Sequence, residues 1–181
     1  REALKTLAGK GLIVARARIG TRVQDRSQWN LFDPDVLIWH AESGFDQAFL
    51  VHLAEMRMAL EPEAAALAAQ RRSPERMAEI RRWADALAAP GITPEGFVEA
   101  DRNLHLAVAA AAANPFMLSI STLIEVALVA VLTVSQPVSD PPRLRRSIVQ
   151  HRAVADAIER ADPEAARAAM REVIQEGLSL F

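Results

Sequence analysis

Apolar residues recur every three or four positions along most of the chain, which is the spacing that puts them on one face of a helix. The longest such pattern runs from Phe45 to Gln70, and its apolar face includes Leu50, Leu53, Leu60 and Leu67. We expect Pro62 to kink this helix or to divide it, because proline has no amide hydrogen for the helical hydrogen bond.

Capping side chains and first-turn prolines mark where the other helices begin. The pairs that combine the two signals are Asp33-Pro34, Ser73-Pro74, Thr93-Pro94 and Asp162-Pro163. Glycines at positions 9, 44 and 91 supply stop signals. Together these patterns predict helices over 1–8, 33–43, 45–70, 73–89, 93–114, 117–134, 143–161 and 162–181, with a loop through Pro137, Pro141 and Pro142.

A strand pattern occurs near the N-terminus, where residues 11–16 and Thr21–Val23 flank the turn-like segment 17–20. Helices account for nearly everything else. We therefore predict an all-α protein, an antiparallel bundle of six or seven helices that follows a short helix and hairpin.

Composition narrows the class of protein further. The chain has 181 residues, of which 51% are hydrophobic, and it contains 7 glycines and no cysteine. This fraction is too apolar for a disordered chain, and the absence of cysteine excludes disulfides, thiolate metal sites and a cysteine nucleophile. The apolar stretch 117–134 contains Glu125 and has no basic residue at either edge, so we interpret it as a core or dimer helix and predict no membrane association.

Charge is distributed unevenly between a basic head and an acidic body. Residues 1–24 have a net charge of +5, whereas residues 25–181 have a net charge of −7. The basic side chains of the head are Arg1, Lys5, Lys10, Arg16, Arg18 and Arg22. Such a head favours an anionic partner, such as nucleic acid, although a solvated basic tail explains the charge equally well.

Asp101 and His105 lie four residues apart, which places a carboxylate and an imidazole on the same face of a helix. Two such side chains can bind one divalent cation, but a surface Asp–His hydrogen bond has the same spacing. Apolar neighbours favour an inward orientation for this pair and for His151, whereas we interpret His40 and His52 as ordinary helix residues.

Arg57 and Glu61 also lie four residues apart. An exposed helical ion pair is one interpretation. Their apolar neighbours permit partial burial, in which case Arg57 could hold a carboxylate ligand through two parallel hydrogen bonds.

In their order and spacing, these segments resemble a bacterial GntR-family transcriptional regulator of the FadR type, over essentially the whole chain. Residues 1–13 resemble the end of the recognition helix and the first wing strand, and residues 16–23 resemble the wing of a winged helix-turn-helix. The segment from Trp29 to Leu37 resembles the linker of members that respond to sugar acids. The helical effector domain is matched by Arg57–Pro62 with Leu67–Ala69, by Asp101–His105 with Ala113–Pro115, and by His151–Ile158.

The resemblance implies three parts, namely a remnant of the DNA-binding domain at 1–24, a linker and linker helix at 25–44, and an effector-binding and dimerisation domain at 45–181. It implies a cytoplasmic homodimer, expected to be a repressor, that binds operator DNA. The DNA contacts would come from Arg1, Lys5, Arg16, Arg18, Thr21 and Arg22. The start at Arg1, inside a helical pattern, predicts that earlier residues are missing and that this chain alone binds operator DNA poorly.

The resemblance also implies an effector site for a small carboxylate such as a sugar acid, formed by Arg57, Asp101, His105 and His151. Members that hold a metal use an Asp and three His, and Asp101, His105 and His151 match three of these positions. Val173 stands where the fourth ligand is expected. The site would hold zinc, nickel or manganese with three protein ligands, or His105 and His151 would donate hydrogen bonds directly to an acidic ligand.

Two other functions are compatible with these residues. Asp101, His105 and His151 with an open coordination position would suit a metal-dependent hydrolase. Alternatively, the helical body is a structural dimerising module in which the Asp101–His105 pair has no ligand.

Overall fold

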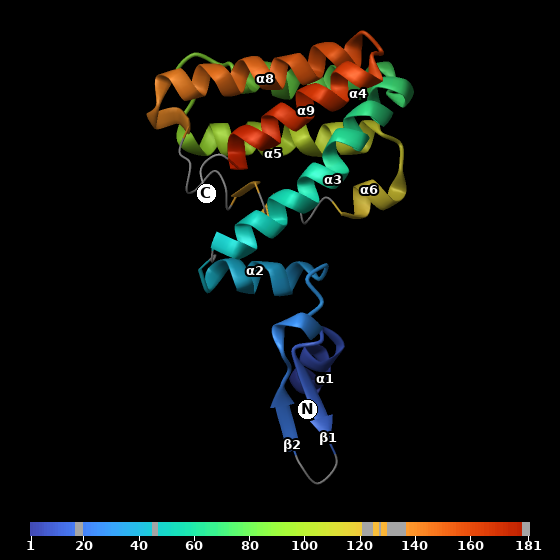
Figure 1. Ribbon diagram of the computed structural model, residues 1–181, viewed down its shortest axis with the longest axis vertical. Coiled ribbons are helices and arrows are strands. Elements are labelled where there is room, and N and C mark those ends of the chain that lie inside the picture. The colour runs from blue at the N-terminus through green and yellow to red at the C-terminus, as the bar shows by residue number, and fades with distance from the viewer. Residues whose placement is uncertain (17–19, 45–46, 121–124, 127, 130–136, 179–181) are drawn as a thin grey trace. The chain divides into compact units, whose positions relative to one another are not determined.

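The computed structural model describes residues 1–181 except 17–19, 45–46, 121–124, 127, 130–136 and 179–181 (Figure 1). The chain divides into two compact units, Arg1–Gly44 and Phe45–Phe181. Each unit has its own internal contacts.

The first unit consists of a helix, a hairpin and a second helix. Helix α1 (Glu2–Gly9) precedes strands β1 (Ile13–Arg16) and β2 (Gly20–Val23), and these are followed by the short 3-10 helix η1 (Arg26–Gln28) and helix α2 (Pro34–Glu42). The strands pair antiparallel, from Ile13 opposite Val23 to Arg16 opposite Gly20. The expected hairpin is therefore present, although Ala17, Arg18 and Ile19 of its turn lie outside the described residues.

Lys10 connects the start of this unit to its last helix. Its Nζ lies 2.7 and 2.8 Å from the two carboxylate oxygens of Asp33, and 2.8 Å from Oδ2 of Asp35. Asp33 also caps α2, as expected, because its Oδ1 accepts a hydrogen bond from the amide of Asp35 at 3.0 Å. The hydrogen bond from Lys10 lowers the pKa of Asp33. One positive charge of the head is thus neutralised within the unit.

Gly11 occupies a position that only glycine can take. Its φ is +76°, in the left-handed region, and a Cβ built on it would lie 2.3 Å from the carbonyl oxygen of Gln28. The turn between α1 and β1 therefore depends on close approach to the backbone of η1.

The second unit is a bundle of helices. The structure describes α3 (Gln47–Arg71), α4 (Pro74–Leu87), α5 (Pro94–Ala111), α6 (Pro115–Ser119), α8 (Pro141–Glu159) and α9 (Pro163–Leu178), with the short 3-10 helix η2 (Pro137–Ser139) before α8. Side chains of Ser73, Thr93, Asn114 and Asp140 cap α4, α5, α6 and α8. The predicted all-α helical fold is confirmed.

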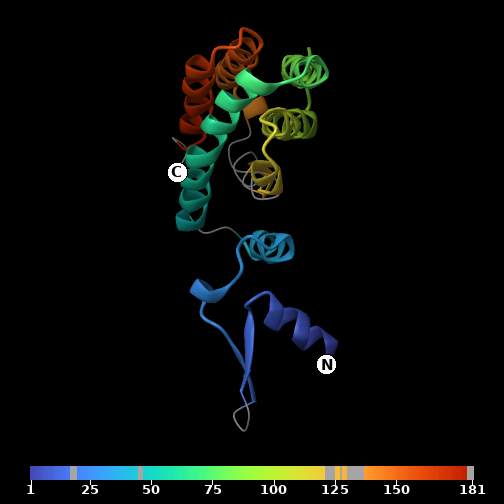
Figure 2. The ribbon, with the colours of Figure 1, turned by 90° about the vertical axis from the view of Figure 1, so that its right-hand side faces the viewer.

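Helix α3 is the centre of the bundle (Figure 2). It packs against α9, α5 and α8, while α4 covers α5 and also contacts α8. Alanines on α3, among them Ala65, Ala68 and Ala69, are fully buried in the core. Because alanine has a small side chain, it allows the neighbouring helix backbones to approach closely. Larger side chains, such as Phe97 and Ile158, fill the space between the other helices.

Two details differ from the prediction. Pro62 does not divide α3, which continues from Gln47 to Arg71 with the proline buried inside it. Pro141 and Pro142 do not lie in a loop but form the first turn of α8, where an amide hydrogen is not needed. Much of the predicted helix 117–134 lies outside the described residues. Within the described part of the chain, every helix is too short or too polar to cross a membrane.

The contact at Gly11 predicts a difference between two glycine-to-alanine substitutions. We expect G11A to destabilise the first unit, because the new methyl group cannot avoid the Gln28 carbonyl. G9A should be neutral or stabilising by about 0.5–1 kcal/mol, because nothing lies within 4 Å of its Cβ position in α1. Amide hydrogen exchange over residues 10–30 measures both effects. Equal protection in the two variants would contradict the prediction.

An ion pair between α3 and α9 predicts a pH dependence of stability. Arg167 donates to both carboxylate oxygens of Glu63, at 2.7 and 3.0 Å, and this pair lowers the pKa of Glu63. A lowered pKa in the folded state stabilises the protein above the unfolded-state pKa, and the contribution is lost as pH falls through the folded-state pKa. Urea unfolding should therefore show wild type more stable than E63Q at pH 7, with a smaller difference at pH 3. A difference that is equal at both pH values would contradict this.

Candidate functional site

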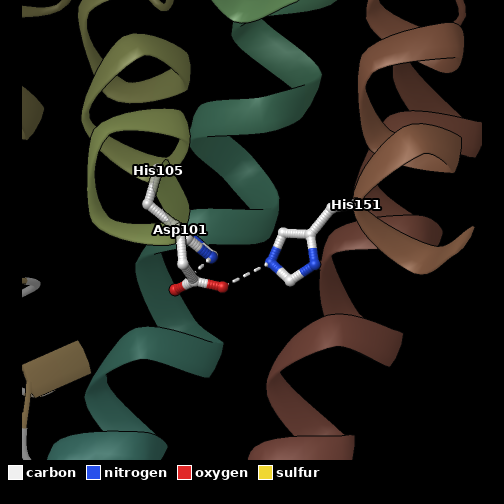
Figure 3. Close-up of side chains that lie close together, drawn as sticks. All are labelled: Asp101, His105 and His151. Atoms are coloured by element: carbon white, nitrogen blue, oxygen red, sulfur yellow. Dashed lines mark ion pairs between the residues drawn. The ribbon is translucent and has the colours of Figure 1, made fainter. Parts of the chain in front are cut away.

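Asp101, His105 and His151 come together between α5 and α8. The first two side chains extend from adjacent turns of α5, and His151 approaches them from α8 (Figure 3). Each offers one ligand atom, and these three atoms all lie within 4.8 Å of one another. The rings of His105 and His151 meet edge to face, with their centroids 5.5 Å apart. All three side chains are buried, with exposed fractions of 2–4%.

The ligand atoms of this cluster lack hydrogen-bond partners. Within the described residues, Oδ2 of Asp101 and the Nε2 atoms of His105 and His151 are buried without a hydrogen bond. His151 Nε2 lies 3.0 Å from Oδ1 of Asp101, which is an ion-pair distance. Leaving three buried polar atoms unsatisfied is costly, so the arrangement calls for a ligand at their common centre.

The other nitrogen of each imidazole is held by an acceptor. Nδ1 of His151 lies 2.7 Å from the carbonyl oxygen of Ser147, which can only accept, so Nδ1 carries hydrogen. Nδ1 of His105 contacts the Glu61 carboxylate on α3 in the same way. If a divalent cation took the place of the ring protons on Nε2, both Nε2 atoms would present lone pairs to the centre of the cluster, which is the orientation that metal-bound histidines have.

Glu61 links the cluster to Arg57. Its Oε1 accepts a hydrogen bond from Nε of Arg57 at 2.5 Å, and its Oε2 contacts His105. Arg57 and Glu61 are only 4% and 3% exposed. The terminal nitrogens of Arg57 have no hydrogen-bond partner in the described part of the chain, so they can still bind an anion.

The charges of the site compensate one another. Burial raises the pKa of Glu61, but Arg57 and His105 outweigh burial and bring it to about 2. In the same way, burial opposes ionisation of Asp101, yet His151 keeps the pKa of Asp101 below its usual value. Burial lowers the pKa of His151, and the Asp101 carboxylate raises it by more. Both carboxylates are therefore ionised near neutral pH.

One carboxylate oxygen and two imidazole nitrogens form a ligand set that suits a divalent cation such as zinc, nickel or manganese. The structure thus places three of the four predicted effector-site residues in one cluster and the fourth, Arg57, beside it through Glu61. Val173 is 9% exposed and packs in the apolar core on α9, where it offers no ligand atom.

Other histidines and the basic head lie elsewhere. His40 is buried on α2 in the first unit, and His52 is exposed on α3. Five of the residues predicted to contact DNA are exposed, namely Arg1, Lys5, Arg16, Thr21 and Arg22, while Arg18 lies outside the described residues. Lys5 makes a surface ion pair with Glu2 at 3.0 Å.

The sequence prediction missed two residues of the site. The sequence indicates Glu61 only as a partner for Arg57, although its i+4 spacing on a buried helix face indicates a buried charge. No motif points to Ser147. It lies one turn before His151, so its carbonyl is the natural acceptor for the ring, but this contact becomes visible only in the structure.

Comparisons with known proteins identify the family of the chain. The FCD domain matches residues 52–176. The uncharacterised HTH-type transcriptional regulator YieP of Escherichia coli (strain K12) is 33% identical over 178 residues, which are 97% of this chain and 75% of the relative. The galactonate operon transcriptional repressor of the same organism is 32% identical over 174 residues, 96% of this chain and 76% of the relative.

This chain belongs to the GntR family of transcriptional regulators and contains an FCD domain. The predicted resemblance is confirmed. The family consists of regulators, so the hydrolase alternative is wrong and the chain is not an enzyme.

Solved structures show the same fold. The GntR regulator of Streptococcus agalactiae matches 99% of this chain and 79% of its own, with a TM-score of 0.63 and 22% identity. The McbR/YncC protein of E. coli matches 99% of this chain and 81% of its own, with a TM-score of 0.67 and 20% identity.

Proposed function

We propose that this GntR-family protein is a transcriptional repressor whose helical domain senses a small carboxylate, such as a sugar acid, at the Asp101–His105–His151 cluster. The observation that carries the proposal is the set of three buried ligand atoms that lack hydrogen-bond partners. A purely structural module would satisfy these atoms within the protein, and the alternative of a dimerising module does not explain them.

Asp101, His105 and His151 would hold a divalent metal, with zinc, nickel and manganese as candidates. Bound there, the metal would offer open coordination positions to the oxygens of a carboxylate ligand. The protein's own contribution is the orientation of the two Nε2 atoms and the exclusion of water by the surrounding apolar residues.

Arg57 is proposed to bind the acid group of the effector. Its Nε is held by Glu61, which fixes the guanidinium and leaves the terminal nitrogens for a carboxylate. One relative is named as the repressor of the galactonate operon, which favours an aldonate as the ligand class for this chain as well.

A small cavity adjoins Glu61 and His105, lined mainly by apolar residues from α3, α5, α6 and α9. Among the described residues, this cavity leaves about 10 Å³ in which the centre of a water molecule can move. That is room for roughly one water. A sugar acid is larger, so its binding would require the lining to move. We propose that this movement couples the site to the arrangement of two DNA-binding heads in a homodimer, because a ligand switches a protein only by binding one arrangement better.

We propose that the exposed basic residues of the hairpin unit contact the phosphate backbone of operator DNA. A regulator that binds DNA in this way would act in the cytoplasm. Arg16, Thr21 and Arg22 lie on the hairpin, where they would provide charge but little base readout.

Zinc is expected to stabilise the protein. At a free zinc concentration of about 100 times its Kd, mass action contributes about 2.7 kcal/mol, which raises the Tm of a domain of this size by roughly 5–10 °C. His151→Ala should abolish this shift, whereas His52→Ala, which removes an exposed histidine on α3, should retain it. The measurement is differential scanning fluorimetry of metal-stripped protein. An equal shift in all three proteins would rule out the proposed metal site.

Carboxylate binding is expected to depend on Arg57. Arg57→Lys keeps the positive charge beside Glu61 but loses the planar fork, so we expect galactonate and other aldonates to bind at least about tenfold more weakly, with little change in zinc affinity. Arg71→Lys, on the same helix, is the matched control. Isothermal titration calorimetry of zinc-loaded protein gives both affinities. Failure of every aldonate and dicarboxylate tested to bind wild type would refute the sensing function.

A further inference from the structure

A single buried carboxylate connects the metal-ligand cluster with the anion-binding arginine. Glu61 lies on the face of α3 toward α5, and its two oxygens have different partners, Arg57 on its own helix and His105 on the neighbouring one. The FCD-domain resemblance assigned no role to this residue. Its position raises the question of whether it serves packing alone or sets the geometry of the site.

We infer that Glu61 is a positioning residue that fixes the ring of His105 with Nε2 turned to the cluster and at the same time holds the guanidinium of Arg57. The inference rests on the proposed function where it concerns metal and carboxylate binding. The orientation of the His105 ring can be tested without assuming that function.

The hydrogen-bond chemistry of histidine supports this role. A neutral histidine carries hydrogen on one ring nitrogen and a lone pair on the other, and the acceptor next to one nitrogen decides which. An ionised carboxylate only accepts, so the contact with Glu61 places hydrogen on Nδ1 of His105. The ring then presents the lone pair of Nε2 on the side of Asp101, whose Oδ2 lies 3.9 Å away.

The two oxygens of Glu61 have separate partners, and both must be acceptors. A carboxylate offers an acceptor to each partner, whereas an amide of the same shape offers one oxygen and one NH₂ group. Glutamine at position 61 therefore cannot accept from both Arg57 and His105. One of the two contacts must be lost, and the positive charge of Arg57 then remains buried without its counter-charge.

His151 has a partner of its own that is independent of Glu61. Its Nδ1 is held by the carbonyl of Ser147 on α8, so its orientation does not require Glu61. Changes at position 61 should consequently act on His105 and Arg57 and leave His151 unchanged. This difference gives the inference an internal control within one site.

The chain also offers a matched control substitution. Glu63 lies two residues after Glu61 on α3 and is bound by Arg167 of α9, outside the cluster. Its side chain is 46% exposed, so E63Q removes the same charge from the same helix without touching either histidine.

The decisive experiment compares wild type, E61Q and E63Q by two measurements. Imidazole ¹⁵N NMR of metal-free protein reports which nitrogen of His105 carries hydrogen, and zinc titration gives the metal affinity. We expect His105 in wild type and E63Q to carry hydrogen on Nδ1, and in E61Q to show a mixture of tautomers, with His151 unchanged. Zinc should bind E61Q about 10–100-fold more weakly and E63Q as tightly as wild type.

The outcomes separate this inference from the proposed function. If zinc does not bind wild type, the metal site fails, while the NMR result still tests the role of Glu61. If E61Q leaves both the tautomer of His105 and the zinc affinity as in wild type, the inference is overturned. If E61Q does not fold, E61D, which keeps the charge and shortens the side chain, takes its place, and the same tautomer change supports the inference.

Discussion

Two carboxylates, Glu61 and Asp101, are buried inside the helical unit, and the arrangement of the site follows from the need to neutralise them there. A buried charge without a partner destabilises a protein strongly, so each acid must be met by a cation or by hydrogen-bond donors. Arg57 and His105 surround Glu61, while His151 approaches Asp101. These contacts link α3, α5 and α8, so the polar cluster also fixes the relative placement of three helices.

The apolar core makes this placement exact. Small side chains on α3, such as Ala65 and Ala68, let the helix lie in the middle of the bundle, in contact with α5, α8 and α9. Side chains within a close-packed interior have few alternative rotamers. The histidines are therefore held in position by packing as well as by hydrogen bonds. The stability of the surrounding fold offsets the free energy lost at their unsatisfied Nε2 atoms. A site that is built at such cost is typical of a binding function.

Charge is used differently in the two units. In the first unit, Lys10 forms ion pairs with Asp33 and Asp35. These pairs connect the end of α1 with the start of α2, so the charge of Lys10 does not add to the exposed positive charge. The basic residues Arg16 and Arg22 of the hairpin are exposed. In the second, half-exposed pairs such as Arg167 with Glu63 connect helices at the surface, where solvent screens them. The buried pairs near His105 experience little screening, so their charges act strongly on one another.

The helical class, most helix limits and the residues that could hold a metal can be predicted from the amino-acid sequence alone. Helical periodicity and capping are local properties, so signals such as Ser73-Pro74 and Thr93-Pro94 could be read without a structure. The i+4 spacing of Asp101 and His105 likewise follows from a single helix.

Contacts between distant segments have no local signal and become visible only in the folded chain. Glu61 and His105 are 44 residues apart in the sequence, and they meet only because α3 packs against α5. His151 likewise approaches Asp101 from a different helix. Val173 is surrounded by apolar residues from several helices. Pro62 shows the same limit, since only burial in the bundle keeps α3 continuous through a residue that locally disfavours a helix. Side chains acquire their partners through packing, and packing depends on the whole fold.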